Sequence, residues 1–573
     1  TKETNFRTFW NSSLQNGVFE LSLTPPVETK KDAKAEETKA AHPQDVKKEE
    51  SKNPEGVASA RMDLAMAAAR INKYNSKEGV WELTVYEKIS IGNGSQANNP
   101  WLQELPDPIS KVTWDNYVTM SPIDMKEKGY RLQERQDREA SIVNVTFGNT
   151  TIALPVYPQP GQARGTIGIA LGYGRTKAGM LSEKSGVVGQ NAYPFVQLTD
   201  GTMHYSVSGV QLSEEVGTTE LAATQVHHTI MGRNLIRETT LEEYKKNQGS
   251  GNEEEKLVTH AGKKDPVAVT LWDEFDRPGH KWGMLIDLGS CIGCGSCVVS
   301  CTAENNVAVV GKDQVRRTRE MHWLRIDRYY QSDMTKEYAE EKQMGSVDMY
   351  LEMENPNAEN PKVIFQPVMC QHCNHAPCET VCPVLATNHS SEGMNQMTYN
   401  RCVGTRYCAN NCPFKVRRFN WYNYNENEAF AGLNPAQDDL GRMVLNPDVV
   451  VRSRGVMEKC SMCVQRVQAG KLDAKKAMQK LQDGAIKTAC QQSCPTEAIV
   501  FGDVNDENSR ISALRKDERN YYMLHELDIK PNVSYLVKVR NTEPELVKAG
   551  GHEGGREHKE EKKEEKKEEK KES

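Results

Sequence analysis

Long apolar runs are missing from this sequence of 573 residues. A membrane-spanning helix needs roughly 18 or more consecutive apolar residues, and no stretch of the sequence approaches that length. The sequence therefore predicts no membrane span, so a membrane role would have to come through a partner. An excess of charge is missing too, because 73 Lys and Arg residues stand against 79 Asp and Glu residues. This balance argues against electrostatic binding to nucleic acid.

Cysteine is missing from more than half of the sequence and then occurs in clusters. The first of the 15 cysteines is Cys291, and all of them fall into four tight groups. A disulfide framework would not cluster in this way, and an odd number of cysteines would leave one sulfur unpaired. The grouping indicates metal binding.

Large apolar residues are scarce in two segments, residues 28–56 and residues 546–573. Both are rich in Lys and Glu, and the second ends in HKEEKKEEKKEEKKES. Such a composition cannot bury a hydrophobic core. We therefore expect a disordered charged insertion and a disordered charged tail.

Two folded regions are expected between these segments. Residues 57–250 contain alternating, β-branched stretches with Pro and Gly between them, such as SIVNVTFGNTTIALPVYPQPG at 141–161, which predict strands. Residues 264–545 contain every cysteine, with short strands, loops around the cysteines and brief helices after them. The polar residues 251–263 are expected to link the two regions.

The cysteine groups follow the spacing of bacterial ferredoxins, C-x2-C-x2-C-x3-C-P. The first group has this cysteine spacing unbroken, and the second has a slightly longer middle gap. The third has Thr405 in place of its second cysteine, and the fourth is split by a long insertion. In chain order the groups are Cys291, Cys294, Cys297 and Cys301; Cys370, Cys373, Cys378 and Cys382; Cys402, Cys408 and Cys412; and Cys460, Cys463, Cys490 and Cys494.

Structural zinc is the main alternative, because paired C-x2-C units suit tetrahedral zinc. Zinc does not need the third and fourth cysteines at this spacing. It also does not account for Pro383, Pro413 and Pro495, each of which follows the last cysteine of its group. A c-type haem is set aside because no C-x-x-C is followed by His. The sequence favours iron–sulfur clusters.

Each cluster is expected to take ligands from two groups. In two-cluster ferredoxins the fourth cysteine of each run binds the other cluster, and the spacing here pairs the inner two groups and the outer two. Three 4Fe-4S clusters and one three-cysteine site result. The predicted ligands are Cys291, Cys294, Cys297 and Cys494; Cys460, Cys463, Cys490 and Cys301; Cys370, Cys373, Cys378 and Cys412; and, at the three-cysteine site, Cys402, Cys408 and Cys382.

Thr405 stands at the vacant corner of the three-cysteine site. A neutral hydroxyl is a poor iron ligand compared with a thiolate, so the simplest prediction is a 3Fe-4S cluster. The alternative is a labile 4Fe-4S cluster bound weakly by Thr405. One unlike cluster among four indicates a step in reduction potential along an electron relay. The nearby Lys415, Arg417 and Arg418 either favour the reduced cluster and dock a partner, or are ordinary surface charge.

Longer phrases around the cysteines carry a family resemblance. They are CQHCNHAPCETVCPVLATNHSSEGMNQMTYNRCVGTRYCANNCPFKVRRFNW, EMHWLRIDRYY, VVVRSRGVMEKCSMCVQR and DIKPNVSYLVKVRN. Residues 264–545 resemble the four-cluster electron-transfer subunits associated with molybdopterin oxidoreductases. Among these, they are most similar to the fused iron–sulfur subunit of alternative complex III, a quinol-oxidising respiratory complex of bacteria. NPWLQELPDPISKVTWDNYVTMSP and the β-rich stretch after it resemble the final barrel domain of the molybdopterin-oxidoreductase fold.

The resemblance implies an α+β fold class. A C-terminal β-barrel domain of the molybdopterin-oxidoreductase-like fold (57–250) would precede a tandem bacterial-ferredoxin-like iron–sulfur domain (264–545). Residues 1–27 would be the end of an upstream domain of that fold, so we expect the sequence to start inside a longer chain. Molybdopterin is expected to be absent, and no cysteine before Cys291 is available to bind molybdenum.

The resemblance also implies an electron-transfer subunit of a quinol oxidoreductase on the periplasmic side of the bacterial inner membrane. The implied partners are integral membrane subunits that bind quinol, multihaem and monohaem c-type cytochromes, and a terminal oxidase. Catalysis would consist of cofactor placement, so no acid, base or nucleophile is nominated. The alternative function is the iron–sulfur arm of a molybdenum-dependent polysulfide or nitrate reductase. For residues 57–250 a pure interaction scaffold is the favoured role.

Overall fold

The residues that the computed structural model describes all belong to one compact unit, Ala68–Ser573. They are residues 80–133, 138–199, 201–231, 233–273, 275–331, 334, 336–356, 361–434 and 438–541. The expected domain end at 1–27, the insertion at 28–56 and the tail at 546–573 lie outside these residues.

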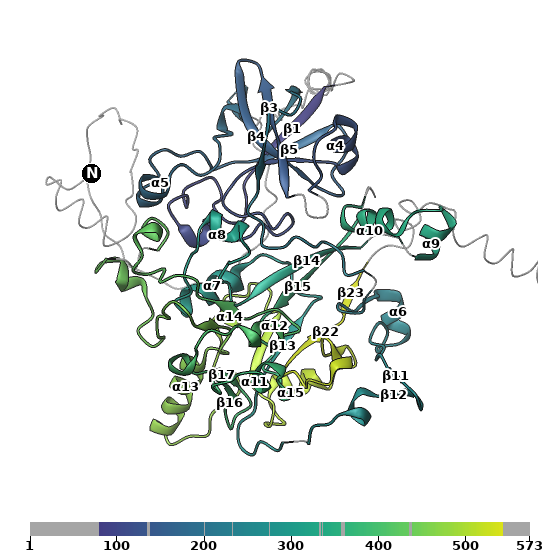
Figure 1. The fold of residues 1–573 in the computed structure, drawn as a ribbon, viewed down its shortest axis with the longest axis vertical. Coiled ribbons are helices and arrows are strands. Elements are labelled where there is room, and N and C mark those ends of the chain that lie inside the picture. Colours follow the sequence, from purple (N-terminus) through teal and green to yellow (C-terminus); the bar gives the residue numbers. More distant parts are fainter. Residues whose placement is uncertain are drawn as a thin grey trace, which may run out of the picture. The chain divides into compact units, whose positions relative to one another are not determined.

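The first described region is a closed β-barrel (Figure 1). Its strands are hydrogen-bonded in the order β4-β2-β5-β1-β8-β3, the pairing of β3 with β4 closes the ring, and β9 adds to β3. The strands are β1 Trp81–Tyr86, β2 Val118–Met120, β3 Glu139–Phe147, β4 Thr150–Pro158, β5 Thr166–Ala170, β8 Ser206–Leu212 and β9 Gly217–Glu220. The prediction of a β-barrel before the cysteine region is confirmed, and its bounds at residues 57 and 250 stay a prediction.

Local sequence explains how the barrel closes. The stretch SIVNVTFGNTTIALPVYP folds as the β3–β4 hairpin, in which Phe147 pairs with Thr150 across a turn at Gly148. Gly148 has φ of +58°, a left-handed conformation that glycine adopts without steric cost. Alternate residues of the strands, among them Val143, Val145 and Leu154, are fully buried inside the barrel. This alternation is the period-two pattern of a strand with one buried face.

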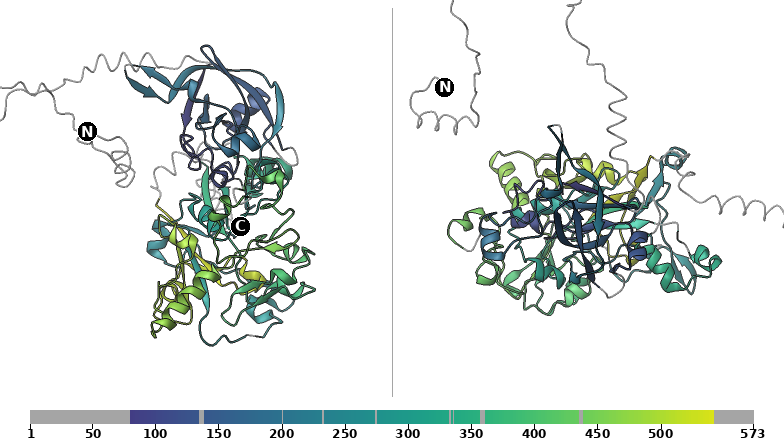
Figure 2. Two further views of the ribbon diagram at one scale, coloured as in Figure 1. Left: turned by 90° about the vertical axis from the view of Figure 1, so that its left-hand side faces the viewer. Right: turned by 90° about the horizontal axis from the view of Figure 1, so that it is seen from above.

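The barrel stands at one end of the described chain (Figure 2). Short elements lie beside the barrel or in the connection that leads from it along the cysteine region. Strand β10 of the connection pairs in parallel with β23, close to the end of the described chain. The elements are α3 Pro100–Gln103, α4 Pro122–Lys128, α5 Met180–Ser185, β6 Gln197–Thr199, β7 Thr202–His204, β10 Glu238–Thr240, α6 Leu241–Lys246, β11 Leu257–Thr259, β12 Gly262–Lys264 and β23 Lys538–Arg540.

The cysteine region is built on small sheets. A four-stranded sheet has the order β20-β13-β22-β21, so its central strand β13 has neighbours from much later in the chain. Three two-stranded sheets, β14–β15, β16–β17 and β18–β19, complete the framework. The strands are β13 Trp282–Asp287, β14 Arg325–Gln331, β15 Lys362–Val368, β16 Thr387–His389, β17 Asn395–Met397, β18 Arg418–Phe419, β19 Met457–Glu458, β20 Ile499–Asp503, β21 Asn520–Tyr521 and β22 Val533–Leu536.

Brief helices stand between these strands. They are α7 Ser296–Glu304, α8 Lys312–Arg316, α9 Lys336–Glu341, α10 Ser346–Glu354, α11 Pro377–Thr380, α12 Tyr407–Asn410, α13 Val464–Lys476, α14 Ala489–Gln492 and α15 Arg510–Arg515. One hydrophobic core joins the cysteine region to the segment before β2, because Leu105 and Trp114 belong to the same buried cluster as Trp282 and Cys297. The barrel region is therefore packed against the cysteine region.

Candidate metal centres

All fifteen cysteines are free thiols, and ten of them are buried. Each group places at least one cysteine inside a short helix and the others in the loops beside it. The helical cysteines are Cys297 and Cys301 in α7, Cys378 in α11, Cys408 in α12 and Cys490 in α14. The four groups therefore share one local architecture, in which some cysteines lie in a short helix and the others lie in the loops beside it.

The outer two groups meet where α7 packs on α14. The hydroxyls of Ser300 and Ser493 form a hydrogen bond of 2.7 Å between the two helices. Burial raises the pKa of Cys297 and that of Cys301. Nearby thiols raise both pKa values further; they are Cys490, Cys291, Cys294 and Cys494 for Cys297, and Cys460, Cys463, Cys490 and Cys297 for Cys301. Residues from both ends of the region thus form two neighbouring sets of sulfurs.

The inner two groups meet where α11 packs on α12. Burial raises the pKa of Cys373, and the thiols of Cys370, Cys412 and Cys378 add to the effect. Burial also raises the pKa of Cys378 to about 12. Cys412 of the third group therefore lies near the sulfurs of the second group. The interleaved ligand sets stay a prediction.

Backbone N–H groups point at several of the sulfurs. The N–H of Ala386 donates to Cys382 Sγ over 3.2 Å, and the N–H of Met457 donates to Cys402 Sγ over 3.4 Å. In the outer groups, the N–H groups of Ala498, Ala489 and Met462 donate to Cys494, Cys463 and Cys460. Hydrogen bonds to a thiolate stabilise its negative charge, and hydrogen bonds to sulfur tune iron–sulfur centres. Free, mostly buried thiols with such donors fit cluster ligands.

Arg417, which follows the third cysteine group, is a basic residue close to the sulfurs of the second and third groups. Its guanidinium is buried and donates to Thr387 Oγ1 over 3.0 Å. Burial lowers the pKa of Arg417, but the thiolates of Cys378, Cys408 and Cys370 outweigh burial, so the pKa is raised overall. Its charge therefore lies among the inner sulfurs.

The two neighbours of Arg417 in the sequence have other partners. Arg418 forms an ion pair of 2.7 Å with Glu320, and Lys415 Nζ donates to the carbonyl of Asn410. Of the three basic residues singled out from the sequence, only Arg417 is engaged with thiols.

The loop around Thr405 is held in left-handed turns. Gly404 has φ of +71° and Arg406 has φ of +63°, and the side chain of Thr405 between them is exposed. A Cβ atom on Gly404 would overlap the carbonyl oxygen of Gly455. Only glycine allows this approach of the two backbones, so the loop that carries Cys402 and Cys408 depends on it.

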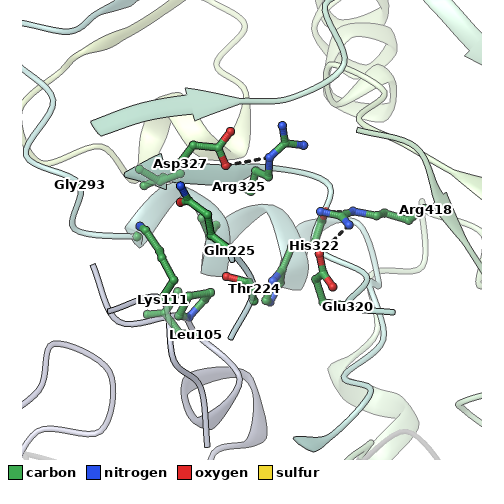
Figure 3. Close-up of a pocket in the computed structure, with 14 residues that line it drawn as sticks. Leu105, Lys111, Thr224, Gln225, Gly293, Glu320, His322, Arg325, Asp327 and Arg418 are labelled. Carbon is green, nitrogen blue, oxygen red and sulfur yellow. Dashed lines mark hydrogen bonds and ion pairs between the residues drawn. The ribbon is translucent and has the colours of Figure 1, made fainter. Parts of the chain in front are cut away.

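A small cavity lies between the first cysteine loop and the barrel side, beside the point where the two are in contact (Figure 3). Its volume of about 20 Å³ is room for about one water molecule. Lys111 and Leu105 line it from the barrel side, and Gly293, Arg325 and Asp327 line it from the cysteine region. Of these residues, only Gly293 belongs to a cysteine motif. The cysteine spacing therefore could not have identified the others.

Two buried ionisable groups tie the barrel side to the cysteine region. Burial lowers the pKa of Lys111 to about 7, and the charge of Arg328 acts in the same direction. Burial raises the pKa of Glu104 to about 7, although the carboxylate accepts the N–H groups of Val310 and Gly311. Charged groups are therefore enclosed at this junction.

The described part of the chain contains neither a site for a single metal ion nor a membrane-spanning helix. No three His, Cys, Asp or Glu side chains within it converge as the ligands of a single metal ion would. A 4Fe-4S cluster does not need such convergence, because its four thiolates bind separate irons. No helix within the described residues is long and apolar enough to cross a membrane.

Known proteins share the cysteine region. The sequence profile of a 4Fe-4S dicluster domain matches residues 290–386, and a second profile with the same description matches residues 361–429. The iron–sulfur subunit of menaquinone reductase from Nitratidesulfovibrio vulgaris is 35% identical over 260 residues, which cover 45% of this chain and 88% of that protein.

Other relatives are more distant. Hdr-like menaquinol oxidoreductase iron-sulfur subunit 1 of Archaeoglobus fulgidus is 28% identical over 45% of this chain and 84% of its own length. A selenate reductase subunit of Mesobacillus selenatarsenatis is 29% identical over 48% of this chain and 79% of its own length. Each of these alignments covers most of the relative and less than half of this chain.

Proposed function

Because the chain belongs to the family of iron–sulfur subunits of quinol and molybdoenzyme-type oxidoreductases, we propose that it relays electrons for a quinol-oxidising respiratory complex. The observation that carries this proposal is the arrangement of the cysteines. All fifteen are free thiols, and the helix pairs α7–α14 and α11–α12 bring the groups together in twos. No acid or base catalyst is needed for such a role.

We assign three 4Fe-4S clusters and one 3Fe-4S cluster to these thiols. When bound, such clusters supply one-electron carriers over a wide range of potentials. The interleaving of the groups supports ligand sets in which each cluster draws on two groups. The sets are Cys291, Cys294, Cys297 and Cys494; Cys460, Cys463, Cys490 and Cys301; Cys370, Cys373, Cys378 and Cys412; and Cys402, Cys408 and Cys382, with Thr405 at the vacant corner.

The chain's own residues perform three tasks in this relay. The thiolates hold the cofactors at fixed positions, and the surrounding core excludes water from the buried thiols. Backbone N–H groups such as that of Ala386 donate to the sulfurs and offset their negative charge. Arg417 adds a fixed cation among the inner sulfurs. Together these residues determine the positions of the clusters and influence their reduction potentials.

The complex we propose is alternative complex III or a close equivalent. One relative is named as a subunit of a menaquinone reductase and another as a subunit of a menaquinol oxidoreductase, which supports quinol as the electron source. Integral membrane subunits would bind the quinol, and c-type haem subunits would accept the electrons. The complex would stand on the periplasmic side of the inner membrane. We assign the barrel to the molybdopterin-oxidoreductase-like fold without its cofactor and give it a scaffold role.

A molybdenum-dependent reductase is the second candidate. The relative that is named as a selenate reductase subunit supports this candidate. In that case this chain would deliver electrons to a molybdenum subunit instead of taking them from quinol. The two candidates differ in metal content, because only the reductase requires molybdenum in its complex.

Metal analysis and electron paramagnetic resonance (EPR) of the purified complex test the proposal. We expect iron and sulfide in amounts that match three 4Fe-4S clusters and one 3Fe-4S cluster per chain, with haem in the same complex and reduction of the clusters by a quinol. Zinc in place of iron would overturn the cluster assignment. Molybdenum at one atom per complex would favour the reductase.

A further inference from the structure

The barrel side contacts the first cysteine loop directly. Leu105 lies so close to Gly295 that a Cβ atom there would be 3.1 Å from Leu105 Cδ1. Phe365 of β15 covers Gly293, where an added Cβ atom would be 2.6 Å from the ring. Both glycines stand between ligand cysteines, so residues outside the cysteine groups form the wall of this site.

Lys111 is the charged member of this wall. It is 3% exposed and lines the same cavity as Gly293 and Gly295. Its Nζ lies 5.8 Å from the centroid of the Phe365 ring, which covers the cysteine loop. The backbone of Lys111 has φ of +63°, a left-handed conformation that is unfavourable for a lysine. The fold thus holds a cation beside the first loop.

The carboxylates near Lys111 are already engaged. Asp327 forms an ion pair of 2.8 Å with Arg325. Asp107 Oδ1 accepts the N–H groups of Ile109 and Ser110. Lys111 itself forms no ion pair with any residue in the described part of the chain, and a second cation, Arg328, is also close to it.

The first sulfur site is a further anionic neighbour of Lys111. The negative charges that raise the pKa of Lys111 are those of Asp327, Asp107 and Cys291, in this order. A buried cation is costly unless an opposite charge compensates it. Thiolate ligands and the cluster that they hold would supply that charge.

We propose that Lys111 is a positioning residue that sets the reduction potential of the cluster held by Cys291, Cys294, Cys297 and Cys494. The inference rests on the proposed function, since it requires a cluster at these thiols. Reduction adds one negative charge to the cluster, and a cation in a poorly solvated site stabilises the more negative state. Lys111 therefore raises the potential. The barrel is then part of the redox apparatus as well as a scaffold.

Redox titration of the purified complex, followed by EPR, tests this role. The variant Lys111→Met removes the charge and keeps most of the side-chain length. We expect the ratio of reduced to oxidised cluster to fall about tenfold at a given potential, which is a shift of about 59 mV for a one-electron couple. The titration is carried out at about pH 6, where Lys111, with a pKa of about 7, is mostly protonated. Only one cluster signal should shift.

Matched variants separate charge from packing. Lys88→Met removes another buried lysine of the barrel side, one that lies over the Tyr117 ring instead of a cysteine loop, and it should leave every potential unchanged. Lys111→Arg keeps the charge and should restore the potential. Leu105→Ala disturbs the same wall without a change of charge, so a shift as large as that of Lys111→Met would overturn the proposal.

The cluster in question is identified by loss of the same signal in Cys294→Ala. Unshifted potentials in Lys111→Met, with all cluster signals intact, would overturn the role of Lys111 and leave the proposed function standing. Absence of iron–sulfur signals from the unmodified complex would instead overturn the proposed function.

Discussion

The guanidinium of Arg452 lies 2.9 Å from the carboxylate of Glu458, and both side chains are almost completely buried. Glu458 also accepts the indole N–H of Trp323 over 2.9 Å and a hydrogen bond from Asn420. The pair joins the loop before β19 to β19 itself, next to Met457, whose N–H donates to Cys402. A buried charge pair thus supports the backbone that holds the three-cysteine site.

Removal of one partner of this pair should strongly destabilise the protein. The variant Glu458→Gln leaves the charge of Arg452 buried and uncompensated, which costs about 3–5 kcal/mol. We expect a much lower midpoint of thermal unfolding. Asp313→Asn is the control, because its pair with Arg317 is 2.9 Å long but lies at the surface, where such pairs contribute about 0–1 kcal/mol. Equal effects of the two changes would contradict this account.

Neighbouring cysteines of the last group should affect different clusters. If the ligand sets interleave, Cys494→Ala alters the same EPR signal as Cys291→Ala. Cys490→Ala then alters the signal that Cys301→Ala alters, although Cys490 and Cys494 belong to the same short stretch of chain. If Cys490→Ala and Cys494→Ala changed the same signal and no other, the interleaved sets would be wrong.

The close approach of Gly404 to Gly455 should be essential for the three-cysteine site. Gly404→Ala places a methyl group against the carbonyl oxygen of Gly455 and strains a backbone with φ of +71°. We expect loss of iron from this site, measured as iron per chain and as loss of the corresponding EPR signal. Gly455→Ala is the matched control, because its φ is +92° but no atom lies within 4 Å of the added Cβ. If Gly455→Ala lost as much iron as Gly404→Ala, backbone strain alone would explain the loss, and the close approach to Gly455 would not be essential.

Thr405 offers a direct test of the cluster type. The variant Thr405→Cys supplies a thiolate at the vacant corner, and the exposed position leaves room for the new side chain. We expect the 3Fe-4S signal to be replaced by a 4Fe-4S signal, with slower quinol oxidation. Thr405→Ser, which adds no thiolate, should keep the original signal. An unchanged 3Fe-4S signal in Thr405→Cys would show that the ligand assignment is wrong.

Glu104 should make stability depend on pH. Burial raises its pKa from 4.5 to about 7, so the folded protein binds this proton more tightly than the unfolded chain does. Stability then falls as the pH rises through this interval. Between about pH 6 and about pH 8 the loss is about 1 kcal/mol. Glu104→Gln should remove it, so that unfolding by urea depends less on pH in the variant. The exposed Asp313→Asn should retain the dependence of the unmodified protein.

Local patterns made much of the architecture predictable. The cysteine groups are short, and the strands β3 and β4 show the alternation of a half-buried sheet within one continuous stretch. The wall around the first site was not predictable in this way. Lys111 and Cys291 are far apart in the sequence, and a lysine in a polar turn is ordinarily at the surface. Arg325 likewise donates to the carbonyls of Phe414 and Lys415, a contact that only the packed structure reveals.

The position of β13 in its sheet has a consequence for how the protein is made. This strand lies between β20 and β22, which end at Asp503 and Leu536. During synthesis, more than two hundred residues after Cys291 must therefore be translated before β20 or β22 can pair with β13. Pairing between such distant segments is slow and leaves apolar surface open meanwhile. Cys494 is the proposed fourth ligand of the first site. The complete ligand set of that site is therefore present only after the other three cysteine groups have been translated.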